Sequence, residues 1–221
     1  MTLEERSCID CQVQACVTEK GSFPNFCPTE ALSAEAVEAS AERYEQDPFA
    51  IKVMQVASAV SVDAFAERWC RVEESLAFFK HMGWKRIGIA SCAGLKEEAG
   101  IFAKILRAKG FEPYGVCCKV ASIPKSRFDA PENCCDFGAV SCNPIMQAQL
   151  LEEANTEANV VIGLCVGHDM LFSAYSAAPV TTLVVKDRAL FHNSVGGLYA
   201  ARGSSFYGSL LKEERDRECC K

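Results

Sequence analysis

Fourteen cysteines in 221 residues are the feature of this sequence that most clearly suggests chemistry. Four of them lie near the amino terminus, at Cys8, Cys11, Cys16 and Cys27, with two, four and ten residues between successive members. The first pair forms a C-x-x-C turn, in which the backbone folds back so that two thiolates can bind one metal ion. Two further local cysteines complete four sulfur ligands. We therefore predict a metal site formed by these four residues.

Two kinds of metal centre fit this segment. It carries few apolar side chains, so metal binding would supply much of its folding free energy. Structural zinc sites commonly use two C-x-x-C or similar pairs, whereas this segment has one. Irregular spacing and a proline after the last cysteine, here Cys27-Pro28, are also found in iron–sulfur proteins. An iron–sulfur cluster is therefore slightly favoured over Zn²⁺. The alternative is a flexible tail with unrelated thiols, or two disulfides.

A second set of cysteines consists of residues that each follow a short apolar run: Cys92, Cys118, Cys142 and Cys165. If these runs are parallel strands, the thiols meet at the carboxyl edge of one sheet, where ligands bind in such folds. Crowded thiolates repel one another, so a cation or an iron–sulfur cluster is the expected occupant. The alternative is that these cysteines are small apolar residues that fill strand–helix junctions.

Other residues are candidates for the rim of this second site. Cys117 precedes Cys118 directly, and because alternate strand residues face opposite sides, only Cys118 is expected to point inward. His168 could be a ligand, an acid–base group or a capping residue, and capping is favoured. Lys186 and His192 follow the last apolar run and could bind an anionic substrate. Arg188 is expected to be surface charge.

The elements that would position these residues follow from hydrophobic periodicity. Short apolar runs alternate with helical stretches after residue 84, which indicates a parallel sheet with crossover helices. We predict an α/β fold in three layers, with about five parallel strands and helices on both faces. The expected strands are 86–90, 114–117, 137–140, 159–164 and 180–185, and the expected helices are 94–109, 144–154 and 167–176.

Three regions are expected along the chain. Residues 1–29 form the four-cysteine metal-binding loop, residues 30–83 a helical segment packed on the core, and residues 84–221 the α/β domain. Asp47-Pro48 is a helix start with an N-cap and a proline at the first helical position. A further helix is expected from about Ser61 to a stop at Gly83.

Composition and charge argue against several classes of function. The net charge of −6 leaves no basic stripe for nucleic acid. No apolar leader and no uninterrupted apolar run of membrane-spanning length is present, so we expect a cytoplasmic protein without a membrane partner. The glycine-rich nucleotide-binding motifs are absent from the sequence. A small molecule or a redox protein remains as the partner, and its identity is open.

Several motifs together resemble a known family. They are the four early cysteines, Cys117-Cys118-Lys119-Val120, Cys142-Asn143-Pro144-Ile145, the segment 163–169 and the segment 184–188. This set, which spans essentially the whole chain, resembles a bacterial and archaeal family of unknown function whose members are described as metal-binding proteins with four N-terminal cysteines. The resemblance implies metal at Cys8, Cys11, Cys16 and Cys27, with zinc the usual suggestion. The segment 189–194 departs from the family pattern, which has a glycine before the histidine and a proline after the asparagine.

Two functional hypotheses follow from the sequence. The first is a cysteine-ligated metalloprotein, with iron–sulfur or zinc, whose second cysteine-rich site at the sheet edge performs redox or sulfur chemistry. The second is a binding or sensor module without catalysis, in which the N-terminal cysteines hold structural zinc. The sequence does not decide whether the protein is an enzyme.

Overall fold

The computed structural model describes residues 5–18, 20–129, 138–202 and 210. The chain forms two compact units, residues 1–58 and residues 59–221. The division falls inside a helix, whereas the sequence suggested boundaries after residues 29 and 83. Those boundaries stay predictions.

Short helices and one longer helix make up the first unit. They are α1 (Ala15–Thr18), the 3-10 helix η2 (Pro28–Ala31), α2 (Ala34–Gln46) and the first half of α3 (Pro48–Glu67). The Asp47 carboxylate accepts hydrogen bonds from the amides of Phe49 and Ala50, at 2.9 and 3.2 Å. The predicted helix start at Asp47-Pro48 is therefore confirmed.

The next helix does not begin where the sequence suggested. Ser61 lies inside α3, and α4 runs from Arg71 to Met82. Arg68, with φ of +58°, breaks the helical path between them. The amide of Cys70 then donates to the Glu73 carboxylate at 2.8 Å, which is the reciprocal bond of a capping box. Gly83 ends α4 in the left-handed conformation, as predicted.

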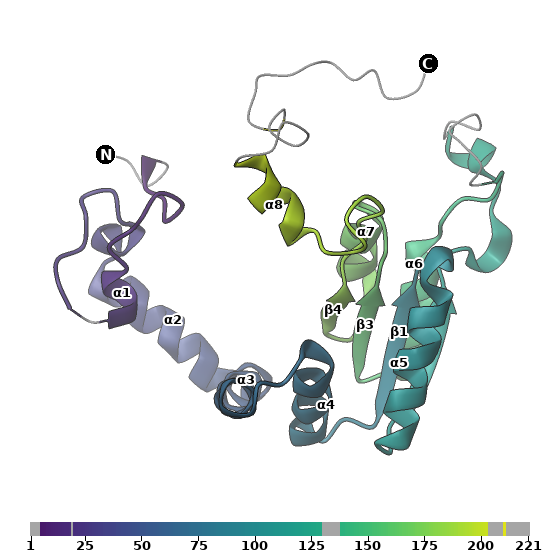
Figure 1. The fold of residues 1–221 in the computed structure, drawn as a ribbon. Coiled ribbons are helices and arrows are strands. Elements are labelled where there is room, and N and C mark those ends of the chain that lie inside the picture. Colours follow the sequence, from purple (N-terminus) through teal and green to yellow (C-terminus); the bar gives the residue numbers. More distant parts are fainter. Residues whose placement is uncertain (1–4, 19, 130–137, 203–209, 211–221) are drawn as a thin grey trace. The chain divides into compact units, whose positions relative to one another are not determined.

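A four-stranded parallel sheet forms the centre of the second unit (Figure 1). Its strands are β1 (Arg86–Ser91), β2 (Glu112–Cys117), β3 (Ala158–Ile162) and β4 (Val180–Val184), in the order β2-β1-β3-β4. The predicted α/β class is confirmed, with four strands in place of about five. Of the expected strand 137–140, Phe137 lies outside the described residues, and Val140 makes one isolated antiparallel bridge with Pro124.

Helices cover both faces of this sheet. They are α5 (Lys96–Ala108), α6 (Pro144–Glu153) and α7 (His168–Tyr175), with short elements η3 (Ala93–Leu95), η4 (Val120–Ser122), η5 (Lys125–Phe128) and α8 (Val195–Ala201). Right-handed crossovers place α5 on one face, and α6 and α7 on the other, because the chain moves from β1 to β2 and then back across the sheet (Figure 1). Phe102, Leu151 and Phe172, one from each helix, belong to the same core cluster.

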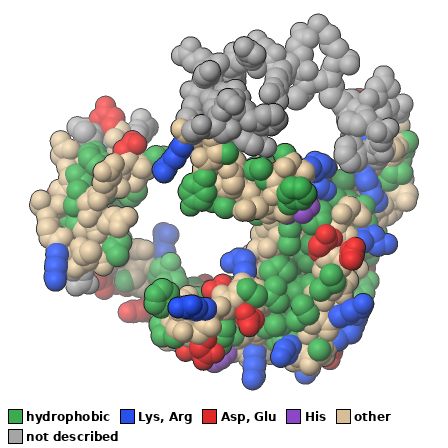
Figure 2. All heavy atoms as spheres, viewed as in Figure 1, with side chains coloured by type: hydrophobic (Ala, Val, Ile, Leu, Met, Phe, Trp, Pro, Cys, Tyr) green, Lys and Arg blue, Asp and Glu red, His purple; other side chains and the backbone are tan. Residues whose placement is uncertain are grey.

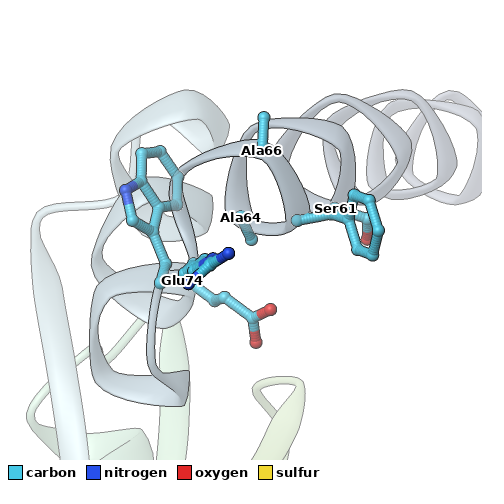
Figure 3. Close-up of a pocket in the computed structure, with 7 residues that line it drawn as sticks. Ser61, Ala64, Ala66 and Glu74 are labelled. Atoms are coloured by element: carbon cyan, nitrogen blue, oxygen red, sulfur yellow. The ribbon is translucent and has the colours of Figure 1, made fainter.

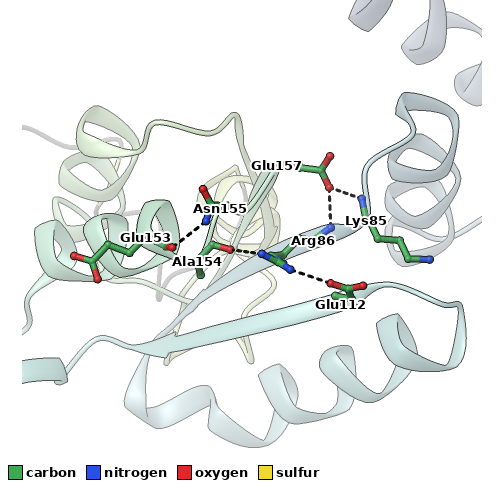
Figure 4. Close-up of polar contacts among 7 residues, drawn as sticks. All are labelled: Lys85, Arg86, Glu112, Glu153, Ala154, Asn155 and Glu157. Carbon is green, nitrogen blue, oxygen red and sulfur yellow. Dashed lines mark hydrogen bonds and ion pairs between the residues drawn. The ribbon is translucent and has the colours of Figure 1, made fainter.

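The amino ends of the strands are held by a polar network (Figure 4). The Glu157 carboxylate accepts from the amides of Lys85 and Arg86 at 2.6 and 2.9 Å. The Arg86 guanidinium donates to the carbonyl of Ala154 at 3.1 Å and to the carboxylate of Glu112 at 3.3 Å. This end of the sheet is therefore tied by structural contacts, which leaves the opposite edge available for ligands.

One element bears on the question of a membrane. Among the described residues, α3 is long and apolar enough to span a bilayer by length and composition alone. Only 11% of its apolar stretch is buried. Core helices of soluble proteins can be equally long and apolar, so length and composition are weak evidence for a span. The predicted cytoplasmic location stays a prediction.

Gly88 in β1 provides a test of core packing. A methyl group there would overlap the side-chain oxygen of Asn159 and lie 3.1 Å from Leu151. We expect Gly88→Ala to lower the free energy of unfolding by about 1–3 kcal/mol, because a well-packed core cannot accept added volume. Gly100→Ala in α5 is the control, since a methyl group added there would meet no neighbouring atom within 4 Å. The control should be neutral or stabilising, and urea midpoints followed by circular dichroism compare the two. Equal midpoints for both variants would contradict the packing seen here.

Candidate functional site

A cavity of about 710 Å³ lies at the carboxyl edge of the sheet. Residues that follow each of the four strands line it: Cys92 after β1, Cys118 after β2, Cys165 after β3 and Lys186 after β4. Cys142, which lies two residues before α6, also lines it. The structure thus brings the four cysteines of the second predicted set to one cavity. Whether they hold a metal or a cluster stays a prediction.

Backbone hydrogen bonds extend the sheet beyond its strands and place three of these cysteines. The amide of Cys92 donates to the carbonyl of Ile162 at 3.0 Å, and that of Cys118 to the carbonyl of Ser91 at 2.8 Å. The amide of Asn143 donates to the carbonyl of Cys118 at 2.8 Å, which brings the start of α6 to the same edge. The positions of these thiols are therefore set by main-chain bonds.

Gln147 in α6 bonds to the two strands that carry Cys92 and Cys118, and it was not anticipated from the sequence. It is fully buried, and its side-chain amide donates to the carbonyls of Ser91 and Val116 at 3.2 and 2.7 Å. Its side-chain oxygen has no hydrogen-bond partner among the described residues. One signal in the sequence could have identified Gln147. It is a polar residue on the apolar face of the helix predicted from Pro144 onward, and buried polar groups need hydrogen-bond partners.

Three cysteines of the lining, Cys92, Cys118 and Cys142, form a row of thiols that shift one another's pKa, and Cys118 acts on both of the others. The Lys186 ammonium donates to the sulfur of Cys92. His168 acts on the pKa of Cys142. Backbone amides add to this, because Gly94 donates to the Cys92 sulfur at 3.4 Å. The row with its two neighbours therefore consists of Lys186, Cys92, Cys118, Cys142 and His168.

These contacts separate the acidities of the three thiols. Hydrogen bonds from Cys118 and then from Lys186 lower the pKa of Cys92 to about 5. Hydrogen bonds from Cys118 and then from His168 lower the pKa of Cys142 to about 4. The same bonds raise the pKa of Cys118, because its proton is required by both neighbours. The bond to Cys142 also raises the pKa of His168. The row therefore consists of a central thiol between two thiolates.

Two further cysteines lie outside this row. Cys165 lines the cavity, but its sulfur lies 3.5 Å from the guanidinium of Arg188. Cys117 is half-buried and packs against the core, and it is absent from the cavity lining. His168 begins α7, where a capping role was expected, and it lines the cavity and lowers the pKa of Cys142.

Several cationic side chains on the lining were missed or misjudged from the sequence. Lys119 and Lys125 line the cavity and were not singled out, and Arg188, expected as surface charge, lines it as well. Lys186 and His192 were anticipated there. On the face drawn in Figure 2, side chains of both charge signs are interspersed. Loop residues are brought together by the fold, and their spacing in sequence carries no such signal.

The four N-terminal cysteines belong to the first unit, but their side chains are not arranged around a common point where a metal ion could bind. Cys8 and Cys16 are exposed, Cys11 is half-buried and Cys27 is buried. The amide of Cys11 donates to the carbonyl of Cys8 at 3.2 Å, as a C-x-x-C turn requires. Arg6 donates to the carbonyl of Cys27 at 2.9 Å. Within the part of the chain that the structure describes, no group of three or more His, Cys, Asp or Glu side chains is arranged to hold a metal ion.

A second cavity, of about 830 Å³, lies between the end of α3 and α4 (Figure 3). Ser61 and Ala64 line it from α3, and Trp69 and Glu74 from the corner and α4. None of the described residues on its lining is a cysteine or histidine. This cavity therefore offers no counterpart to the row of thiols.

Comparison with known proteins identifies relatives without assigning a reaction. Residues 27–183 match the family described as "Protein of unknown function (DUF1847)". This span includes Cys92, Cys118, Cys142, Cys165 and His168. A relative from Methanocaldococcus jannaschii, "Uncharacterized protein MJ0455", is 46% identical over 149 residues, which are 67% of this chain and 76% of the relative.

The pKa shifts predict an unusual pH dependence of thiol alkylation. In the folded protein, Cys92 and Cys142 should react with iodoacetamide at rates that change little from about pH 9 down to about pH 6, because the thiolates persist. The rates should fall only as the pH approaches about 5 for Cys92 and about 4 for Cys142. In urea the same peptides should slow by about tenfold for each unit below about pH 8.5. Peptide mass spectrometry after timed quenching measures the alkylation rates in the folded protein and in urea. Identical profiles in the folded and unfolded protein would contradict the row of thiols.

Proposed function

The chain belongs to the DUF1847 family of proteins of unknown function, and from its own side chains we propose that the cavity performs thiol–disulfide exchange. Cys142 acts as the nucleophile, Cys118 as the resolving thiol and Cys92 as the proton acceptor. The observation that supports this proposal is that Cys92, Cys118 and Cys142 line one cavity, where the pKa of Cys118 is raised and the pKa values of the other two are lowered.

Exposure distinguishes the two ends of the row. Cys142 is half-buried, whereas Cys92 is only 8% exposed and is covered by Lys186. A substrate in the cavity therefore reaches the sulfur of Cys142 more readily. Cys118 is 2% exposed and can attack only a sulfur that is already beside it. That geometry suits a resolving thiol, because a bond to Cys142 needs no large movement.

The proposed exchange balances in atoms and electrons. The Cys142 thiolate attacks one sulfur of a substrate disulfide, which forms a mixed disulfide and releases the first substrate thiolate. The Cys118 thiol passes its proton to the Cys92 thiolate and attacks the sulfur of Cys142. This step forms the Cys118–Cys142 disulfide and releases the second substrate thiolate. Two electrons have passed to the substrate, and Cys92 is a neutral thiol. A dithiol reductant reverses both exchanges and restores the row.

The arrangement favours exchange over a metal at this edge. No described group of three or more His, Cys, Asp or Glu side chains is arranged for a metal ion. Cys165 faces Arg188, whose positive charge opposes a further cation. A cluster or metal at Cys92, Cys118, Cys142 and Cys165 stays a prediction from the sequence, and the exchange requires none.

We also propose that the N-terminal cysteines bind an iron–sulfur cluster or Zn²⁺. The turn between Cys8 and Cys11 supports this, as does the bond from Arg6 to the carbonyl of Cys27, which holds the two parts of the loop together. The side chains do not converge as placed. Binding would therefore draw the loop closed around the metal, as is usual where metal binding and folding are linked.

The exchange predicts a specific effect of Cys118→Ser. Treated with a small disulfide, the wild-type protein should form the Cys118–Cys142 disulfide, whereas Cys118→Ser should accumulate the mixed disulfide on Cys142. Without a resolving thiol, this species should persist at least about tenfold longer. Acid quenching and peptide mass mapping distinguish the two products.

Cys117→Ser is the matched control, since Cys117 is the adjacent thiol that does not line the cavity. It should form the internal disulfide as the wild type does. The proposal is wrong if Cys118→Ser and Cys117→Ser give the same products, or if Cys142 fails to react in the wild type.

The N-terminal proposal predicts a loss of metal in Cys11→Ser. Protein purified without oxygen should contain iron or zinc, and the variant should lose most of it because one of four sulfur ligands is missing. Cys70→Ser is the control, because Cys70 is exposed and lies outside both cysteine sets. Elemental analysis and the visible spectrum measure the content. Equal metal content in the two variants would count against this site, and zinc without any reactivity of Cys142 would favour the binding or sensor module.

A further inference from the structure

The cavity lining is positive, although the chain as a whole is acidic. Lys119, Lys125, Lys186 and Arg188 line it, and no described residue of the lining is Asp or Glu. The net charge of the chain is −6. A concave site lined by one sign of charge focuses the electrostatic potential and raises the local concentration of oppositely charged ligands. The two thiolates of the row offset only part of this charge.

The lysine ammonium groups of the lining differ in whether they already form hydrogen bonds within the protein. The Lys186 ammonium bonds to Cys92, and that of Lys119 donates to the carbonyl of Val140 at 2.6 Å. The Lys125 ammonium makes no hydrogen bond or ion pair with another described residue, whereas its backbone amide donates to the carbonyl of Ala139 at 2.8 Å. Its main chain is therefore held, and the residue lines the cavity. Lys125 is the cation best suited to meet a ligand.

His192 adds a neutral donor to the same lining. Its amide donates to the carbonyl of Asp187 at 2.8 Å, and its Nδ1 accepts from the amide of Asp187 at 3.0 Å. In a neutral imidazole whose Nδ1 accepts, the proton is on Nε2. The Nε2–H group is then the one left for a ligand.

The loop that carries His192 is built to hold this orientation. The Asp187 carboxylate accepts from the amides of Ala189 and Leu190 at 3.0 and 2.9 Å. Phe191 and His192 both have positive φ, at +52° and +63°. Such conformations persist in residues other than glycine only where the surroundings impose them, and they are concentrated at binding sites. The internal bonds of the loop impose them here.

Size narrows the class of ligand. The volume of about 710 Å³ falls in the range of small-molecule pockets and is far larger than an inorganic oxyanion needs. An organic molecule therefore fits, with its reacting atom at the sulfur of Cys142. The positive lining favours a ligand with a negative charge, and Lys125 and His192 line the same cavity as Cys142.

We propose that the substrate is a small organic disulfide that carries a negative charge, bound by Lys125 and by the Nε2–H group of His192. This inference rests on the proposed exchange and specifies its substrate. Carboxylate, sulfonate and phosphate groups share the chemistry that the lining recognises. Neutral disulfides of similar size react with the same thiolate, but they have no negative charge for Lys125 and His192 to bind.

Two chromogenic disulfides test this selectivity. The anionic probe is 5,5′-dithiobis(2-nitrobenzoate), and the neutral probe is 2,2′-dithiodipyridine. The measured quantity is the initial rate at which the Cys118–Cys142 disulfide appears for each probe, by acid quenching and peptide mass mapping, which excludes the other cysteines. Lys125→Gln should lower the ratio of the anionic to the neutral rate about threefold to tenfold, because one facing charge is lost. Lys125→Arg should restore most of that ratio, and the wild-type ratio should fall as salt is added.

Lys104→Gln is the matched control, since Lys104 is an exposed residue of α5 that does not line the cavity. Its ratio should equal that of the wild type. Equal ratios in Lys125→Gln and Lys104→Gln, with the internal disulfide still forming, would overturn the anionic substrate and leave the exchange intact. Failure of the wild type to form that disulfide with either probe would overturn both.

Discussion

The order β2-β1-β3-β4 is the constraint from which the rest of the second unit follows. The chain leaves β1 towards one neighbour and returns through β3 on the other side, so the connections after these strands run to opposite faces. No single turn can close the space between their carboxyl ends, and ligand sites form at such points. Main-chain bonds from Cys92 to Ile162 and from Cys118 to Ser91 hold the rim of this space rigid. The opposite ends of the strands are closed by the Glu157 and Arg86 network, which holds no cysteine.

Charge balance explains why three sulfurs can lie side by side in this space. Two neighbouring thiolates would repel each other, and the proton of Cys118 between Cys92 and Cys142 removes that repulsion. Lys186 and His168 stabilise the outer ends of the row. The same arrangement separates three chemically identical side chains into one thiol and two thiolates. Environment, not residue type, therefore assigns the roles.

Local physics made much of the fold predictable. Apolar runs indicated the four strands that form, and Asp47-Pro48 and Gly83 indicated a helix start and a helix end, because capping depends on neighbours in sequence. Two expectations differ from the structure. No break precedes Ser61, so α3 continues to Glu67. Among the described residues of the expected strand 137–140, Val140 makes one isolated antiparallel bridge, because pairing within the sheet depends on residues far apart in the chain.

The sequence by itself determined that several thiols leave their strands at the same edge, because the strands are parallel, Cys92 and Cys118 follow one directly, and Cys165 comes three residues after another. Only the tertiary structure decided which thiols meet. Strand order is set by packing between residues far apart in the chain, and it places β2 beside β1, so that Cys118 reaches both Cys92 and Cys142. That order also makes the Lys186 side chain extend past the end of β3 to Cys92, while Cys165 turns to Arg188. Such pairings depend on distances in the folded protein, and the spacing of residues along the sequence does not give these distances.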